Sequence, residues 1–141
     1  MKRFSFRMQK VLEYRRMVED WAKTAYTESQ ARLLSGQSDL AAMKSKREQV
    51  LRSPWEPTIE ARQNLDAYLE RLEDEARAQL AVIGVLENEV DEARAEWLLA
   101  RQEAEAMQKL RDKALEEWQL EVNRAEQREM DEFANNRREA A

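Results

Sequence analysis

The stretch SPWEP, from Ser53 to Pro57, interrupts a sequence otherwise suited to helices and therefore sets where the chain turns. Each proline lacks a backbone N–H donor and restricts the residue before it, so no regular helix passes through both. On either side Ala, Glu, Arg, Leu, Gln and Lys dominate, and these residues lose little free energy on entering a helix. The sequence predicts helices at about 4–52 and about 58–136, joined by a turn at about 53–57. We expect Pro57 near the first helical position of the second helix.

The composition favours long helices over a globular domain. Charged residues make up 38% of the 141-residue chain, which contains two glycines and two prolines. So polar a chain cannot fill a broad core, and its apolar side chains are expected along a seam, the line on which two helices meet. The expected fold class is all-α, a single antiparallel two-helix coiled-coil hairpin that covers residues 1–141.

Several classes of function are disfavoured by what the chain lacks. It has no Cys and no His, the residues that supply thiolate nucleophiles, most zinc ligands and the commonest general base. Carboxylates alone give weak sites for hard metal ions, and two paired helices offer no closed pocket in which a pKa could be tuned. We therefore expect neither an enzyme nor a metal or cofactor site.

Charge and hydropathy favour a soluble, intracellular chain that does not bind nucleic acid. The net charge is -5, whereas binding to a duplex needs a basic surface. The longest apolar run, at Leu80–Leu86, is far shorter than the roughly 20 residues that span a bilayer. The start of the chain is basic, with Lys2, Arg3, Arg7 and Lys10. It leaves open a peripheral amphipathic helix on an anionic membrane.

A heptad repeat runs through the second half of the chain. Apolar side chains recur at two positions of the repeat, interrupted only by Gln79, Arg111 and Glu121. One position holds Leu69, Ala76, Ile83, Val90, Trp97, Ala104, Arg111, Trp118 and Ala125, and the other holds Leu65, Leu72, Gln79, Leu86, Ala93, Ala100, Met107, Ala114 and Glu121. A repeat sustained over so many heptads is a specific signal for a coiled coil.

The matching repeat in the first helix is less regular. Its seam positions are expected at Phe4, Val11, Tyr14, Val18, Trp21, Ala25, Leu33, Leu40, Met43 and Val50. The step from Ala25 to Leu33 departs from the seven-residue spacing and predicts a local change in supercoiling. Gly36 follows this step, and it is either a weak point in a continuous helix or a break re-capped by Ser38 or Asp39.

The two predicted helices differ in length, which predicts an uncovered end. With the turn near residue 55, residues that face each other in an antiparallel pair should have numbers adding up to about 110, so Val11 should face Leu99. Beyond about residue 107 the second helix would have no partner within the chain. Its apolar stripe nevertheless continues to Phe133, and apolar surface left in water forgoes about 25 cal/mol per Å². We expect a protruding C-terminal helix that binds another protein or, in the isolated chain, a second copy.

The segment Leu80–Leu86 is apolar on more than one face. Two interpretations stay open for it. One is a well-buried waist in which Tyr26 and its neighbours wrap the other helix, and the other is a lateral docking patch.

Both ends of the chain resemble the flagellar FliJ family. The start, FSFRMQKVLEYR at residues 4–15, resembles the family's opening, in which two aromatic residues precede an apolar-Gln-x-apolar-Leu-x-Tyr-Arg run. The end, MDEFA at residues 130–134, is similar to the family's C-terminal stretch. Length, hairpin organisation and turn position are similar as well, so the resemblance covers the whole chain.

This resemblance implies a cytoplasmic component of the flagellar type III export apparatus, peripherally associated with the inner membrane at the flagellar base. Proteins of the family form an antiparallel coiled coil similar to the stalk subunit of rotary ATPases. They insert their paired ends into the hexameric ring of the export ATPase, promote assembly of that ring, and link it to the membrane export gate and to export chaperones. The implied role is that of a stalk and adaptor without catalytic activity.

The resemblance also implies two sets of binding residues. The set facing the ATPase ring is Phe4, Phe6, Met8, Val11, Leu12, Met130, Asp131, Glu132 and Phe133. The set contacting the cytoplasmic domain of the export gate is Tyr68, Leu72, Glu75 and Gln79. Glu75 and Gln79 depart from the small apolar and polar ring residues usual there in the family. From the residues alone, the stalk of a related virulence secretion system and a generic coiled-coil scaffold stay open as alternatives.

Overall fold

The computed structural model describes residues 3–140, which form two α-helices. Helix α1 spans Gln9–Arg52 and helix α2 spans Ile59–Ala140, with 44 and 82 residues respectively. No β-strand occurs within residues 3–140. The predicted all-α class is therefore confirmed, and its cause is the near absence of glycine and proline, the two residues that weaken a helix most.

Both helices differ from the expected bounds at the ends of the chain. α1 begins at Gln9 rather than near residue 4, and its entry is fixed by bonds from the Gln9 N–H to the Phe6 carbonyl and from the Leu12 N–H to the Met8 carbonyl. α2 continues to Ala140, beyond the expected end near residue 136. The extra turn is polar and fully exposed.

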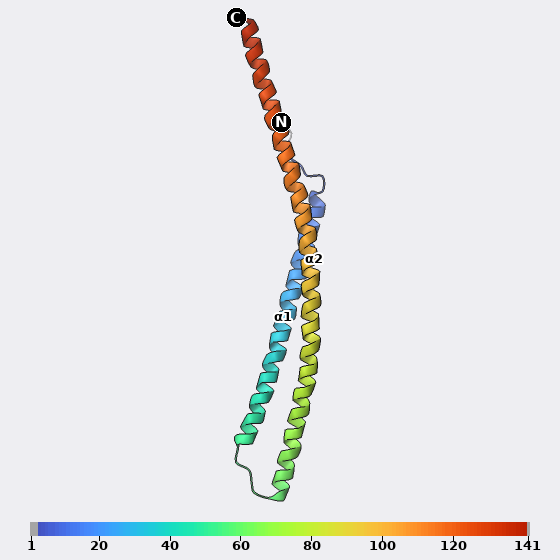
Figure 1. Cartoon of the computed structure of the whole chain (residues 1–141), viewed down its shortest axis with the longest axis vertical. Coiled ribbons are helices and arrows are strands. Elements are labelled where there is room, and N and C mark those ends of the chain that lie inside the picture. The colour runs from blue at the N-terminus through green and yellow to red at the C-terminus, as the bar shows by residue number, and fades with distance from the viewer. Residues whose placement is uncertain (1–2, 141) are drawn as a thin grey trace. The chain divides into compact units, whose positions relative to one another are not determined.

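The connection between the helices lies at residues 53–58 (Figure 1). At the end of α1, the Ser53 hydroxyl donates to the Gln49 carbonyl at 2.7 Å. At the start of α2, the Thr58 hydroxyl accepts the Ala61 N–H at 3.1 Å, which makes Thr58 the residue that caps the helix. The expected place of Pro57 is therefore wrong, because it precedes the cap and lies outside α2.

Two compact units divide the chain. The loop unit is Trp21–Leu98, and the terminal unit joins the two ends of the chain, Met1–Asp20 and Leu99–Ala141, of which residues 3–20 and 99–140 are described. α1 and α2 each run continuously through the boundary between the units.

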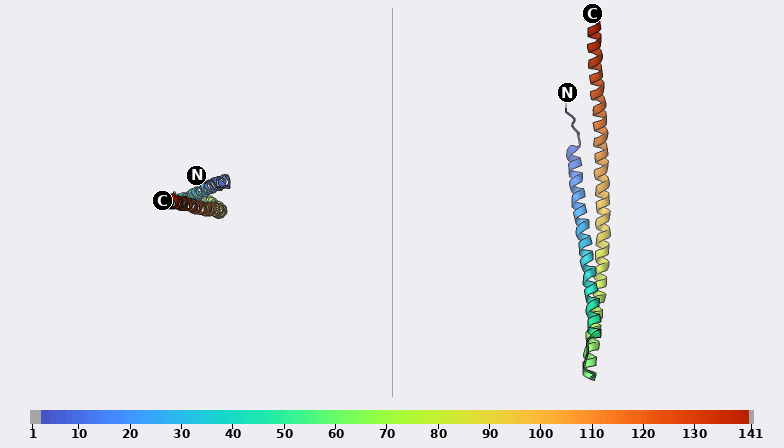
Figure 2. Two further views of the ribbon diagram at one scale, coloured as in Figure 1. Left: turned by 90° about the horizontal axis from the view of Figure 1, so that it is seen from above. Right: turned by 90° about the vertical axis from the view of Figure 1, so that its left-hand side faces the viewer.

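In the loop unit, α1 and α2 lie side by side above the connecting residues, as Figures 1 and 2 show. The partners on α2 have lower numbers as α1 proceeds. The Tyr26 and Trp97 rings stack at 5.7 Å, Arg32 lies 3.9 Å from Glu89, and Arg47 lies 2.9 Å from Glu73. These partners lie about ten residues further along α2 than equal helical lengths from residue 55 predict. The reason is the irregular segment 53–58, because an extended residue spans roughly twice the length of a helical one.

In the terminal unit, the start of the chain packs against the middle of α2. The Phe4 and Trp118 ring centroids are 5.9 Å apart, the Arg111 Nε donates to the Gln9 side-chain oxygen at 3.1 Å, and Arg15 lies 2.6 Å from Glu103. Cover of α2 by its own chain therefore extends to Trp118. The prediction that it ends near residue 107 is wrong, for the same reason as in the loop unit.

The face of α2 that meets α1 was predicted well. The two heptad positions are buried or half-buried from Leu65 to Trp118, including Gln79 and Arg111, and the most buried are Leu72, Ile83, Ala100, Ala104 and Met107. The pattern changes only after Trp118. Glu121 is exposed there and Val122 is half-buried in its place.

The face of α1 that meets α2 was predicted less well. Most of its buried and half-buried residues follow one heptad repeat, at positions 12, 15, 19, 22, 26, 29, 33, 36, 40, 43 and 50. Arg47 is exposed within this repeat, and Gln9 and Val18 are half-buried beside it. Leu33, Leu40, Met43 and Val50 lie on this seam as predicted. Val11, Tyr14, Trp21 and Ala25 do not, because they are exposed, each one position before a seam residue. The predicted slip in spacing is therefore wrong.

Gly36 and Gly84 behave differently. α1 continues through Gly36 without a break, so the re-capped break is wrong. Gly36 is buried, and a Cβ there would lie 2.9 Å from the Leu86 Cδ1. A Cβ at Gly84 would meet nothing within 4 Å. Gly84 lies in the segment Leu80–Leu86, for which a well-buried waist was one interpretation. That interpretation is wrong, because Leu80, Val82 and Val85 are exposed.

Candidate interaction surfaces

The N-terminal part of the expected ring-facing set is divided between the seam and the surface. Met8 and Val11 are exposed, whereas Phe4 and Phe6 are half-buried. Leu12 is fully buried in the seam. The local reason is the start of α1 at Gln9, which leaves Phe4 and Phe6 on an irregular segment and gives Leu12 a seam position. Leu12 therefore holds the two helices together and presents no surface.

Phe4 is fixed by two contacts from α2. Its ring forms a tilted pair with Trp118 and also lies 5.5 Å from the guanidinium of Arg111. The same guanidinium binds the side chain of Gln9, so Arg111 joins the irregular segment to the first turn of α1. Aromatic pairs and cation–π contacts each stabilise by roughly 0.5–1.5 kcal/mol. Phe4 is thus an internal anchor as well as a candidate contact.

The C-terminal part of the set lies on an uncovered stretch of α2. Met130 is 67% exposed and Phe133 is 69% exposed. Together with Glu126 and Glu129 they line a shallow depression along the helix. Asp131 and Glu132 are also exposed, and Asp131 accepts a bond from Gln127 one turn earlier. Large apolar side chains and carboxylates therefore share one surface at this end.

The structure does not bring the two parts of the ring-facing set together. Phe4 contacts Trp118, which precedes Met130 by twelve residues. At 1.5 Å per residue, that separation is about 18 Å along α2. The two parts therefore form two successive surfaces on the terminal unit.

The expected gate-contacting set lies in the loop unit and is divided in the same way. Leu72 is 4% exposed, and the Gln79 amide donates to the Gly36 carbonyl at 2.9 Å. Tyr68 is half-buried, and its ring centroid lies 6.0 Å from the ammonium of Lys46 and 5.1 Å from the guanidinium of Arg71.

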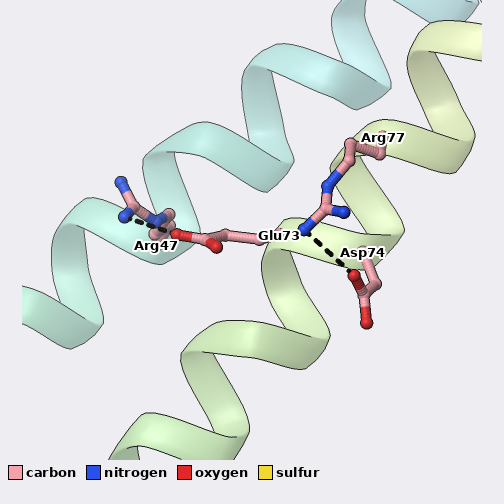
Figure 3. Close-up of polar contacts among 4 residues, drawn as sticks. All are labelled: Arg47, Glu73, Asp74 and Arg77. Atoms are coloured by element: carbon pink, nitrogen blue, oxygen red, sulfur yellow. Dashed lines mark hydrogen bonds and ion pairs between the residues drawn. The ribbon is translucent and has the colours of Figure 1, made fainter.

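The gate-contacting set is surrounded by ion pairs. Glu75 is exposed and 4.0 Å from Arg71. Figure 3 shows the neighbouring Arg47–Glu73 pair, which joins α1 to α2, and the Asp74–Arg77 pair within α2. All of these side chains are more than two-fifths exposed, so they form a charged surface around the buried Leu72.

Within residues 3–140, no group of three or more acidic side chains is arranged to hold a metal ion. Over the same residues, neither helix has a segment long and apolar enough to cross a bilayer.

A comparison with known protein families matches residues 4–139 to the model of one family, described as the flagellar FliJ protein. The match covers nearly the entire chain, including the motifs at residues 4–15 and 130–134. The chain belongs to the FliJ family. No curated protein matches the chain, and no solved structure matches it. Membership in the FliJ family associates the chain with the flagellum and its type III export system, as a structural or adaptor protein.

Sequence reasoning missed two features of this FliJ-family chain. Arg111 was taken as an interruption of the seam, although it binds both Phe4 and Gln9. The available signal was its heptad position, which Trp118 occupies in the next heptad. The exposed Tyr14 and Met17 were also missed, since Tyr14 was assigned to the seam. Their spacing with Lys10 shows a separate basic and apolar face of α1.

Proposed function

We propose that this chain is a non-catalytic stalk and adaptor of the flagellar type III export apparatus. In this role it inserts its ends into the hexameric ring of the export ATPase, promotes assembly of the ring, and links it to the export gate and to export chaperones. The observation that carries the proposal is the FliJ-family match together with the uncovered Met130 and Phe133. The proposed location is the cytoplasm at the flagellar base, with peripheral association at the inner membrane.

The proposed architecture is a single antiparallel coiled-coil hairpin whose longer C-terminal helix protrudes. Partner numbers that fall along α2 as α1 proceeds support this direction within each unit, from Tyr26–Trp97 to Arg47–Glu73 and from Phe4–Trp118 to Arg15–Glu103. The lengths of the helices, 44 and 82 residues, support the protrusion.

The proposed ring contact uses the exposed members of the ring-facing set. Met130 and Phe133 supply apolar area, and Asp131 and Glu132 add charge beside it. Met8 and Val11 contribute a second exposed surface at the start of the chain. Phe4 and Leu12 hold the start of the chain against α2, and Phe6 is half-buried beside them. A stalk acts on a ring only through contacts that differ between subunit states, so each of these contacts must favour one state of the ATPase.

The proposed gate contact uses the surface of the loop unit around Tyr68 and Glu75. These two side chains reach solvent. Leu72 and Gln79 lie beneath them in the seam, and in the proposal they keep the helices at the spacing on which the surface depends.

The test is the effect of the chain on the ATPase of the same flagellar system. Hydrolysis rate and oligomer size are measured with the full chain, with a chain ending at residue 125, and with a Met130→Ala/Phe133→Ala variant. The full chain should raise the hexamer fraction, and the other two should lose most of this effect.

Leu120→Ala is the matched control for the stalk test, because Leu120 is also exposed on α2 but lies on the opposite side of the helix from Phe133. It should behave as the full chain does. A full chain that changes neither hydrolysis nor oligomer size would contradict the stalk function.

A further inference from the structure

The outward side of α1 in the terminal unit is an apolar and basic face. Tyr14 is 53% exposed and Met17 is 45% exposed, and both lie opposite the buried Leu12. One turn before Tyr14 is Lys10, which is also exposed. Over residues 3–17 the chain carries five Arg or Lys residues and one Glu. The face therefore suits an acidic partner that carries apolar side chains.

The end of α2 carries a surface of the opposite charge. Glu126 is exposed beside the uncovered Met130 and Phe133. Over residues 121–133 the chain carries five Asp or Glu residues and two Arg. Steps of four residues lead from Trp118, which packs on Phe4, through Val122 to Glu126 and Met130. This surface therefore continues the side of α2 on which the start of the chain lies.

The two surfaces have the same spacing and complementary chemistry. Lys10, Tyr14 and Met17 are separated by four and three residues, and so are Glu126, Met130 and Phe133. Aligned in parallel, they place an ammonium against a carboxylate and a methionine against an aromatic ring twice. Sulfur–aromatic contacts stabilise packing, and the charge pair fixes the register.

We propose that two copies of this chain associate reciprocally, with Lys10, Tyr14 and Met17 of each copy against Glu126, Met130 and Phe133 of the other. The proposal goes beyond the stalk function, because it concerns the chain alone and rests on these two surfaces. It also has a consequence for that function. The dimer covers Met130 and Phe133, so the chain cannot present them to another protein until the copies separate.

A second copy satisfies both surfaces at once. An anionic membrane would cover the basic face of α1 but repel the carboxylates of α2, and a basic protein would do the reverse. In the pair, the basic face of each copy meets the acidic surface of the other. The two contacts therefore cover all four surfaces.

The geometry of the terminal unit allows this pairing with two-fold symmetry. Arg15 binds Glu103, so Tyr14 is level with about residue 105 of its own α2. The partner's Met130 would lie at that level. The two-fold axis then passes halfway between residue 105 and Met130 of α2, near Trp118. It relates the contact at one Tyr14 to the contact at the other, as an isologous dimer requires.

Cross-linking tests the pairing directly, because the chain has no Cys of its own. A Tyr14→Cys/Met130→Cys variant should form a covalent dimer under mild oxidation. A disulfide within one chain is excluded, since Glu103 beside Tyr14 and Met130 are about 40 Å apart along α2, whereas the Cα atoms of a disulfide lie within roughly 7 Å. Tyr14→Cys/Leu120→Cys is the control, and it should form no covalent dimer because its second thiol lies about 15 Å along the helix from the expected contact.

Sedimentation of the full chain gives an independent test. The native chain should dimerise, and Lys10→Glu or Glu126→Lys should each weaken the dimer by about fivefold, with high salt acting in the same direction. The double exchange should restore the affinity, which a structural defect would not allow. A chain that stays monomeric at low salt, fails to cross-link, or binds anionic phosphatidylserine vesicles as a monomer would overturn the proposal. The ATPase is absent from these measurements, so their outcome is separate from that of the stalk test.

Discussion

The side-chain amide of Gln79 donates to the backbone carbonyl of Gly36 at 2.9 Å, across the line where α2 meets α1. Gln79 interrupts the heptad pattern, and Gly36 interrupts the helical composition of α1. In the structure the two interruptions occur together because the two residues contact each other. The absence of a Cβ at Gly36 brings the two helices close, and the amide that fills the space binds the exposed backbone oxygen.

Removing the Gln79 amide should destabilise the loop unit. Gln79→Ala loses one hydrogen bond across the seam and should cost about 1 kcal/mol, measured as a shift in the urea unfolding curve followed by circular dichroism. Gln79→Glu keeps the size but replaces the donor with a carboxylate beside the Gly36 carbonyl. It should cost more than Gln79→Ala, and an equal or smaller cost would argue against the bond.

The two glycines should respond in opposite ways to alanine. Gly84 has open space around its Cα, so Gly84→Ala should stabilise the chain by up to about 1 kcal/mol through helix propensity alone. Gly36→Ala gains the same propensity but pushes the Leu86 Cδ1 aside, and it should stabilise less or destabilise. Thermal unfolding of the two variants compares them directly. A larger gain at Gly36 would contradict the close approach.

Leu12 and Val11 are neighbours in sequence with different roles in stability. Leu12 is fully buried, and Leu12→Ala should cost about 2–4 kcal/mol because it removes buried methyl groups. Val11 is exposed, and Val11→Ala should change stability by less than about 0.5 kcal/mol. Denaturant midpoints measure both. A cost at Val11 that equals or exceeds the cost at Leu12 would contradict the seam of α1 seen in the structure.

The Arg47–Glu73 pair should contribute little, despite its 2.9 Å distance. Both side chains are more than two-fifths exposed, and such pairs stabilise by at most about 1 kcal/mol. A double-mutant cycle with Arg47→Ala and Glu73→Ala measures the coupling. It should fall further in high salt because the charges are screened. A coupling that survives high salt would indicate a role beyond a surface ion pair.

The sequence predicted the seam of α2 because its heptad positions are filled by large apolar side chains. From Leu65 to Trp118 the hydrophobic pattern and the buried face agree. The same reasoning failed on α1. There the seam contains Arg15, Ala22, Ser29 and Gly36, while Tyr14 and Trp21 lie outside. Small residues let the helices approach closely, and a hydrophobic pattern detects neither them nor a polar seam residue such as Arg15.

The candidate sites were predictable in part. The exposed Met130 and Phe133 follow from an apolar stripe that continues past the last covered residue. The sequence did not predict which other residues of the ring-facing and gate-contacting sets are buried, because the resemblance implies their binding role and not their exposure. Leu12 and Leu72 belong to the sets that the resemblance implies, and both are buried in the seam, where the heptad pattern had also placed Leu72.

Two helices follow from composition and pattern alone, since SPWEP is the one strong interruption in a helix-forming composition, and so does the seam of α2. Tertiary structure decided the register between the helices and the face that α1 buries. Register depends on the length that the irregular residues 53–58 span, which composition does not specify. The buried face of α1 depends on how closely the backbones approach, which is settled only when Gly36 and Ser29 meet the side chains of α2.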